Sequence, residues 1–144
     1  MTWKNEKKSK ALLVVFGIYL ALLAWCILFK FALRPEEIPH LRGINLIPYA
    51  ASVVVNGKVQ ISEIIENMLV FLPFGLCISA FYPDSEIQNR ILLASGLSLF
   101  FEVTQYIFAI GASDITDVID NTLGAVIGIL LYLGMKKIWK EKTG

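Results

Sequence analysis

Eight polar residues lie within or at the edges of apolar stretches of the sequence, where they could bind a ligand or exchange a proton. They are Glu63, Glu66, Asn67, Glu102, Gln105, Asp117, Asp120 and Asn121. Ionisable residues in such surroundings usually face the interior of a helical bundle or a wet cavity. Carboxylates could hold a divalent cation, or one could serve as a general acid whose protonated form is favoured by its apolar surroundings.

The sequence lacks the residues needed for several common catalytic and binding chemistries. His40 is the single histidine and lies outside the apolar stretches, so a Ser-His-Asp triad is poorly supported. The sequence contains neither a glycine-rich phosphate loop nor an HExxH motif. We therefore expect no cofactor and no metal ligand set, and a non-enzymatic protein is favoured. The alternative is a membrane enzyme that uses the same acids on a lipid-linked cell-envelope substrate.

The composition indicates which solvent surrounds these residues. Of 144 residues, 56% are hydrophobic and only 17% are charged, with a net charge of +1. The mean hydropathy is +0.66. Soluble domains carry roughly 25% charged residues, and a chain of this size cannot hide so much apolar surface in one core. Disorder, a disulfide scaffold and a nucleic-acid-binding module are excluded, and a lipid environment is indicated.

Four apolar segments are long enough to cross a bilayer, which takes about 20 helical residues. They span about residues 11–33, 62–81, 91–110 and 115–138. Because unpaired backbone groups are costly in lipid, helices are the expected form. The sequence predicts an all-α integral membrane protein with four transmembrane helices and a single domain over residues 1–144.

Basic residues predict the orientation, since cytoplasmic loops carry more of them. With four spans, nine basic residues fall on the side of both termini and four on the other. Both termini are therefore predicted to be cytoplasmic, and residues 34–61 form a long external loop. Within this loop, Asn56-Gly57 between valine-rich segments is a hairpin signal, although such an apolar run could equally lie in the membrane interface.

The buried polar residues are predicted to converge in the outer half of the bilayer. Glu102 lies eight residues before Ile110, which is roughly 12 Å along a helix. Residues three and four apart share a helix face. These spacings group Ser98, Glu102 and Gln105 on the third helix, and Asp114, Asp117 and Asn121 on the fourth. On the second helix they group Glu63 with Glu66, and Asn67 lies beside them. A polar pocket open to the outside is predicted.

Structural alternatives exist for several of these residues. Asp114 could be the N-cap of the fourth helix, and Ser62-Glu63 could cap the second. The amides could be hydrogen-bonding links between helices. The acids could be neutralised by Lys30, Arg34 or Arg42. Glu102 is not expected to serve at a helix end, so a functional or tightly paired role is favoured for it.

Small residues continue the polar face of the fourth helix. Gly124 and Gly128 form a Gly-x-x-x-Gly pattern, which lets another helix approach closely. This face could serve packing within the bundle or the formation of a homodimer.

An ordered set of motifs resembles the VanZ-like family over about residues 40–135. The motifs are Asn45-Leu46-Ile47-Pro48-Tyr49, Glu66-Asn67-Met68-Leu69-Val70-Phe71-Leu72-Pro73-Phe74-Gly75, Glu102-Val103-Thr104-Gln105, Asp114-Ile115-Thr116-Asp117 and Asn121-Thr122-Leu123-Gly124. The resemblance implies a small, multi-pass protein of the bacterial cell membrane. It also implies a link to low-level resistance to teicoplanin, a lipid-bearing glycopeptide antibiotic.

The resemblance and the convergence together define the expected binding site. Its residues are Asn45, Glu66, Asn67, Glu102, Gln105, Asp114, Asp117 and Asn121. The expected partner is a membrane lipid or another amphiphile whose head group enters the outer pocket, and no nucleic acid is expected.

Overall fold

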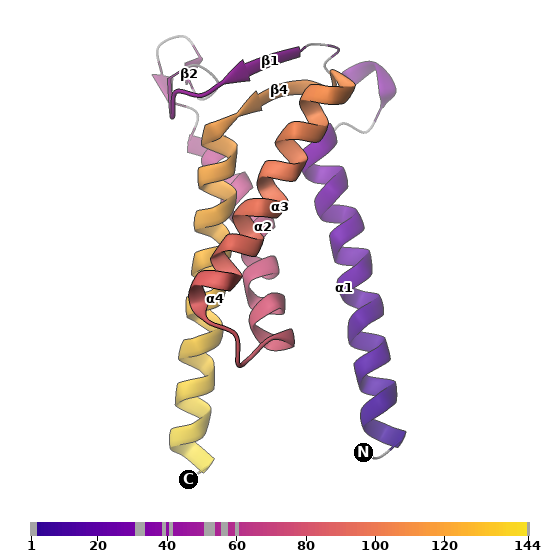
Figure 1. Ribbon diagram of the computed structural model, residues 1–144, viewed down its shortest axis with the longest axis vertical. Helices are drawn as coiled ribbons and strands as arrows, with labels where there is room; N and C mark the ends of the chain where they lie inside the picture. The colour runs from indigo at the N-terminus through magenta and orange to yellow at the C-terminus, as the bar shows by residue number, and fades with distance from the viewer. Residues whose placement is uncertain are drawn as a thin grey trace.

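A computed structural model describes residues 3–30, 34–38, 40, 42–50, 54–55, 58–59 and 61–143. Four helices dominate it (Figure 1): α1 Trp3–Phe29, α2 Ile61–Phe81, α3 Ile87–Phe108 and α4 Ile115–Thr143. Each contains a segment long and apolar enough to cross a membrane. The predicted four-helix membrane fold is confirmed.

The helix ends differ from those expected. The first helix begins before residue 11 and ends at Phe29, because Lys30 takes a left-handed backbone conformation, with φ of 45°. The expected end at residue 33 lies outside the described residues. α3 begins at Ile87, and α4 continues to Thr143. These extensions are polar, and hydropathy alone could not include them in a span.

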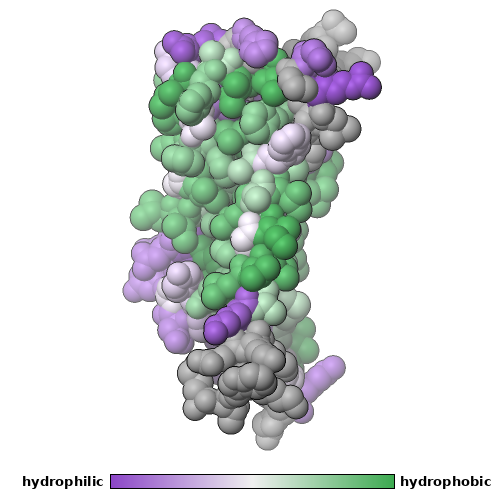
Figure 2. Space-filling view, turned by 90° about the vertical axis from the view of Figure 1, so that its right-hand side faces the viewer, coloured by the Kyte–Doolittle hydropathy of each residue, from purple (hydrophilic) through white to green (hydrophobic). Residues whose placement is uncertain are grey.

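The two ends of the molecule differ in kind. Both chain termini lie at one end, called here the terminal end, and the short strands lie at the other, called the strand end (Figure 1). Figure 2 shows a largely hydrophobic surface along the middle of the helices, with hydrophilic residues at the strand end and again in the lower half of the view. This banding is what a bilayer around the middle of the helices requires.

Two pairs of short strands depart from the all-helical prediction. β1 (Arg42–Asn45) and β4 (Gly111–Asp114) pair in parallel and bring Asn45 opposite Asp114. β2 (Val54–Val55) and β3 (Lys58–Val59) pair antiparallel, which confirms the hairpin signal. Residues 56–57, which carry that signal, lie outside the described residues. A 3-10 turn, η1 (Pro35–Glu37), precedes β1.

Glycines allow α2 and α4 to pack closely, and this is the most extensive helix pair. A Cβ atom added at Gly124 would overlap the carbonyl oxygen of Met68, and one at Gly128 would overlap that of Leu72. One at Gly75 would overlap the carbonyl oxygen of Ala125. The Gly124/Gly128 face is thus filled by α2 of the same chain. The predicted role of this face in packing within the bundle is therefore met, and the homodimer stays a prediction.

The first helix joins the bundle through its contacts with α2 and α3. Near its middle, the hydroxyl of Tyr19 donates to the carbonyl oxygen of Val70, at 2.7 Å. Toward the strand end, Leu23 and Ile27 pack into the core with Phe71 and Phe101. Toward the terminal end, an apolar groove of about 260 Å³ lies between α1, α2 and α3. The helix therefore packs into the core mainly near the strand end.

Candidate functional site

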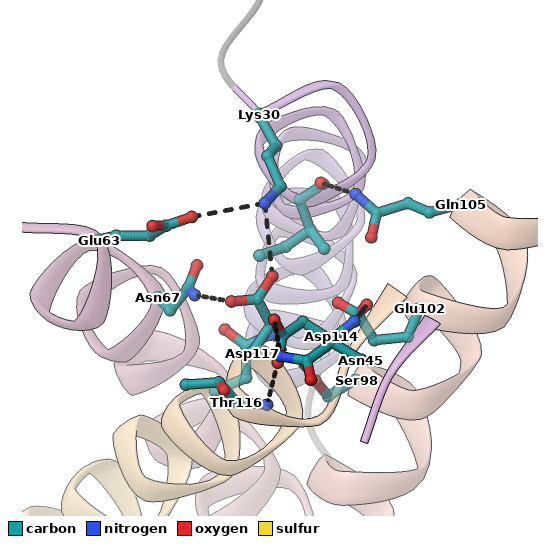
Figure 3. Close-up of polar contacts among 12 residues, drawn as sticks. Lys30, Asn45, Glu63, Asn67, Ser98, Glu102, Gln105, Asp114, Thr116 and Asp117 are labelled. Carbon is teal, nitrogen blue, oxygen red and sulfur yellow. Dashed lines mark hydrogen bonds and ion pairs between the residues drawn. The ribbon is translucent and has the colours of Figure 1, made fainter. Parts of the chain in front are cut away.

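Polar side chains from α2, α3 and α4, from β1 and β4, and from Lys30 just after α1 meet at the strand end (Figure 3). We call this group the polar cluster. Its members are Lys30, Asn45, Tyr49, Glu63, Asn67, Ser98, Glu102, Gln105, Asp114, Thr116, Asp117, Asp120 and Asn121. Many are almost fully buried, including Glu102 and Asn121, which are 1% and 0% exposed.

The junction between β4 and α4 is held by side-chain hydrogen bonds. Asp114 caps α4: its Oδ1 accepts the N–H of Thr116 at 2.7 Å, and its Oδ2 accepts from the Asn45 amide at 2.9 Å. The N–H of Asp114 itself donates to Glu102 Oε2 at 2.7 Å. In a capping box this N–H would be satisfied by the third residue of the helix. Here the carboxylate of Glu102, which belongs to α3, accepts this hydrogen bond instead.

This contact corrects one prediction. Glu102 was expected to have no helix-end role, because it lies in the middle of its own span. It serves the start of a different helix, which neither spacing nor hydropathy along α3 could indicate. The N-cap alternative for Asp114 is correct.

Because Glu102 accepts the N–H of Asp114, the carboxylate of Asp117 can contact α2 and the end of α1 as well as its own helix, α4. Its Oδ1 accepts from the Asn67 amide at 2.8 Å, and its Oδ2 lies 3.6 Å from Lys30 Nζ. The same ammonium lies 3.4 Å from Glu63 Oε1. Burial opposes the charged form of Lys30, but Asp117, Glu63 and Glu102 outweigh that effect and raise its pKa. Lys30 is therefore protonated at neutral pH and joins α1 to α2 and α4.

Two buried amides connect further helices. The Gln105 amide donates to the carbonyl oxygen of Ile27 at 2.8 Å, near the end of α1. The Asn121 amide donates to Ser98 Oγ at 2.9 Å and joins α4 to α3. Both contacts agree with the expected faces of α3 and α4.

The turn after β1 covers one side of the cluster. The N–H of Tyr49 donates to Thr116 Oγ1 at 3.0 Å, and its hydroxyl donates to Asp120 Oδ1 at 2.9 Å. Tyr49 has a left-handed backbone, with φ of 56°, which is uncommon for a residue with a side chain. Burial and the hydrogen bond to Asp120 raise the pKa of Tyr49, so it stays a neutral donor at physiological pH.

The structure brings together seven of the eight expected site residues. The exception is Glu66, whose side chain is exposed. α2 turns Asn67 and Phe71 inward, because its close contact with α4 runs along Gly75. The expected grouping of Glu63 with Glu66 is therefore wrong, since Glu63 reaches the cluster and Glu66 does not.

Sequence reasoning left several cluster residues out of the expected site. Lys30 was considered only as a neutralising charge, and Asp120 was recognised as polar but not selected. Tyr49 was quoted only within a motif. Its aromatic ring gave no polar signal, and its contact with Asp120 joins residues 71 positions apart.

Four buried oxygen atoms of the cluster have no hydrogen-bond partner among the described residues. They are Glu102 Oε1, Gln105 Oε1, Asp120 Oδ2 and Asn121 Oδ1. Buried polar atoms are nearly always satisfied, so each such atom calls for an explanation. Among the described residues, no group of three or more His, Cys, Asp and Glu side chains is arranged to hold a metal ion. Because the four atoms without a partner are acceptors, the cluster can accept hydrogen bonds from a donor group.

Fold and site define a class: a multi-pass membrane protein with a buried polar cluster at one end of its helices. Residues 16–139 match the family model described as VanZ/LLP1. Protein VanZ of Enterococcus faecium is 38% identical over 120 residues, which cover 82% of this chain and 71% of that protein. No solved structure matches. The chain belongs to the VanZ/LLP1 family, which at family level implies a function of the teicoplanin-resistance type.

Proposed function

We propose that the polar cluster binds the head group of an amphiphile or envelope lipid, and that this binding contributes to lipoglycopeptide resistance. The observation that carries the proposal is a set of four acceptor oxygens in buried side chains that have no partner among the described residues. Leaving such atoms unsatisfied costs about 1–3 kcal/mol each. A ligand that donates hydrogen bonds to them would offset this cost.

We place the cluster in the outer leaflet of the bacterial cell membrane. The support is the distribution of basic residues: the lysines at both termini lie at the terminal end of the bundle. Since cytoplasmic segments are enriched in lysine and arginine, the terminal end faces the cytoplasm and the strand end faces outward. A head group in the outer leaflet would then lie at the depth of the cluster.

The apolar groove beside α1 supports an amphiphile rather than a wholly polar ligand. Its walls come from α1, α2 and α3 and include Phe16, Leu20, Phe74, Ile78, Leu93 and Leu97. Leu97 precedes Glu102 by five residues on α3, which is roughly 8 Å along the helix. A ligand with its head in the cluster could therefore lay an acyl chain along this groove.

Susceptibility of bacteria to a lipoglycopeptide tests the proposal. Cells producing the wild-type chain are expected to be protected, and Glu102→Gln or Asp117→Asn should lower protection to the level of cells without the protein. Glu102→Gln places N–H donors at an acceptor position, and Asp117→Asn removes a carboxylate from the cluster. Both changes conserve size.

The matched control is Glu66→Gln, the same change at an acid of α2 that is exposed and outside the cluster. It should keep the wild-type protection at equal abundance in the membrane. No protection by the wild type, or unchanged protection in both cluster variants, contradicts the proposal.

A further inference from the structure

Four atoms of the polar cluster have no partner in the part of the chain that the structure describes, and they share one chemical property: all are oxygen atoms that can accept hydrogen bonds. When they are ionised, the carboxylates of Glu102 and Asp120 accept hydrogen bonds and have no donor. Gln105 must turn its N–H₂ group toward the carbonyl oxygen of Ile27, and this leaves its own oxygen as the free end. The free oxygen of Gln105 is thus an acceptor because of its own hydrogen bond, and those of Glu102 and Asp120 are acceptors in the ionised form.

The charges of the cluster are also one-sided. Besides the Asp114 carboxylate, which is hydrogen-bonded to Asn45 and Thr116, three carboxylates of the cluster are buried, those of Glu102, Asp117 and Asp120. Among the described residues, the ion pairs of the cluster are made by Lys30 alone. A buried carboxylate is stabilised by a nearby cation and by hydrogen-bond donors, so this set of acids favours a partner that brings both.

Lys30 is a cation in the cluster, but its contacts with the acids are long. Its ammonium lies 3.4 Å from Glu63 and 3.6 Å from Asp117, beyond the 2.7–3.2 Å of a good N–H···O hydrogen bond. Its side chain is 39% exposed, and it is the first residue after α1 ends at Phe29. The lysine can thus swing toward solvent without disturbing a core contact.

We propose that the cluster selects a primary ammonium group carried by an amphiphile, and that the Lys30 ammonium occupies its place when no ligand is bound. This inference rests on the proposed function and names its ligand class. A primary ammonium brings a positive charge and three donors, which matches the unpartnered acceptors. The group could belong to a lipid head group of the ethanolamine type or to an amine-bearing amphiphilic drug.

Binding of short-chain phospholipids to the purified full chain in detergent tests the selection. The probes are dioctanoyl phosphatidylethanolamine, phosphatidylcholine and phosphatidylglycerol. The ethanolamine lipid is expected to bind about tenfold tighter than the choline lipid, which has the same charge but no ammonium donors. The glycerol lipid, with donors but no cation, should bind weakest. Dodecylamine separates the two sources, since equal binding favours any amine amphiphile and weaker binding favours the lipid head group.

Substitution of Lys30 tests the displacement. Lys30→Gln empties the ammonium position and should tighten ethanolamine-lipid binding by roughly fivefold. Lys30→Arg keeps a cation there and should not tighten binding. Lys140→Gln, the same change at an exposed lysine near the other end of the molecule, should have no effect.

The outcomes separate this inference from the proposed function. Equal binding of ethanolamine and choline lipids, or weaker ethanolamine-lipid binding in Lys30→Gln, overturns the inference. If the glycerol lipid binds tightest and that binding is lost in Glu102→Gln, head-group binding stands and amine selection falls. If none of the lipids or dodecylamine binds the wild-type chain, both fall.

Discussion

Gly124→Leu is expected to prevent the chain from folding. A Cβ at this position would overlap the backbone of Met68 in α2, so the two helices would have to separate. Overpacking a tight interface costs roughly 1–3 kcal/mol even where side chains can move aside. Here the obstacle is backbone, and the pair it disrupts is the most extensive one in the bundle. We therefore expect a loss of about 3 kcal/mol or more.

Size-exclusion profiles and thermal unfolding in detergent measure this effect. Gly134→Leu is the matched control, because it makes the same change on the same helix where a Cβ would meet nothing within 4 Å. It should behave like the wild type or be slightly more stable, since leucine has the higher helix propensity. Equal stability of the two variants would show that α2 and α4 do not pack through these glycines.

Glu102→Leu is expected to destabilise the fold, whereas Glu102→Gln is expected to preserve it. Leucine removes the acceptor for the N–H of Asp114 and leaves that group unsatisfied at the start of α4. The expected cost is about 1–3 kcal/mol. Glutamine keeps a carbonyl oxygen that can accept the same hydrogen bond. The free energy of unfolding in mixed micelles, measured for both variants, checks the difference.

This pair separates the two roles of Glu102. If glutamine keeps the stability but loses the protection, then Oε2 supports the fold and Oε1 serves a ligand. If both variants unfold with the same loss of stability, the residue is chiefly a structural tie, and loss of protection in Glu102→Gln says nothing about binding.

Much of the fold could be predicted because it depends on local properties. Long apolar segments specify membrane helices through their length and hydropathy, whatever their neighbours are. The inward faces of α3 and α4 also follow from local spacing, since Glu102 and Gln105 are three residues apart. Asp114 as an N-cap is local chemistry too.

The remaining features depend on contacts between distant parts of the chain. The parallel pair of β1 and β4 joins residues 42–45 to residues 111–114, and neither strand is long enough to show a period of its own. α2 presents Asn67 instead of Glu66 because of its contact with α4 through Gly75. Lys30 reaches the cluster because α1 ends there in a left-handed residue. Hydropathy and spacing along one segment do not indicate which distant residues it contacts.

Native mass spectrometry of the protein, extracted gently from the bacterial membrane, tests most directly whether the polar cluster holds an amphiphile. The wild-type chain is expected to carry a bound lipid-sized adduct, and Glu102→Gln is expected to lose it while remaining folded. Glu66→Gln should keep the adduct. A wild-type protein without any adduct, or an adduct retained equally by folded Glu102→Gln, would contradict the account.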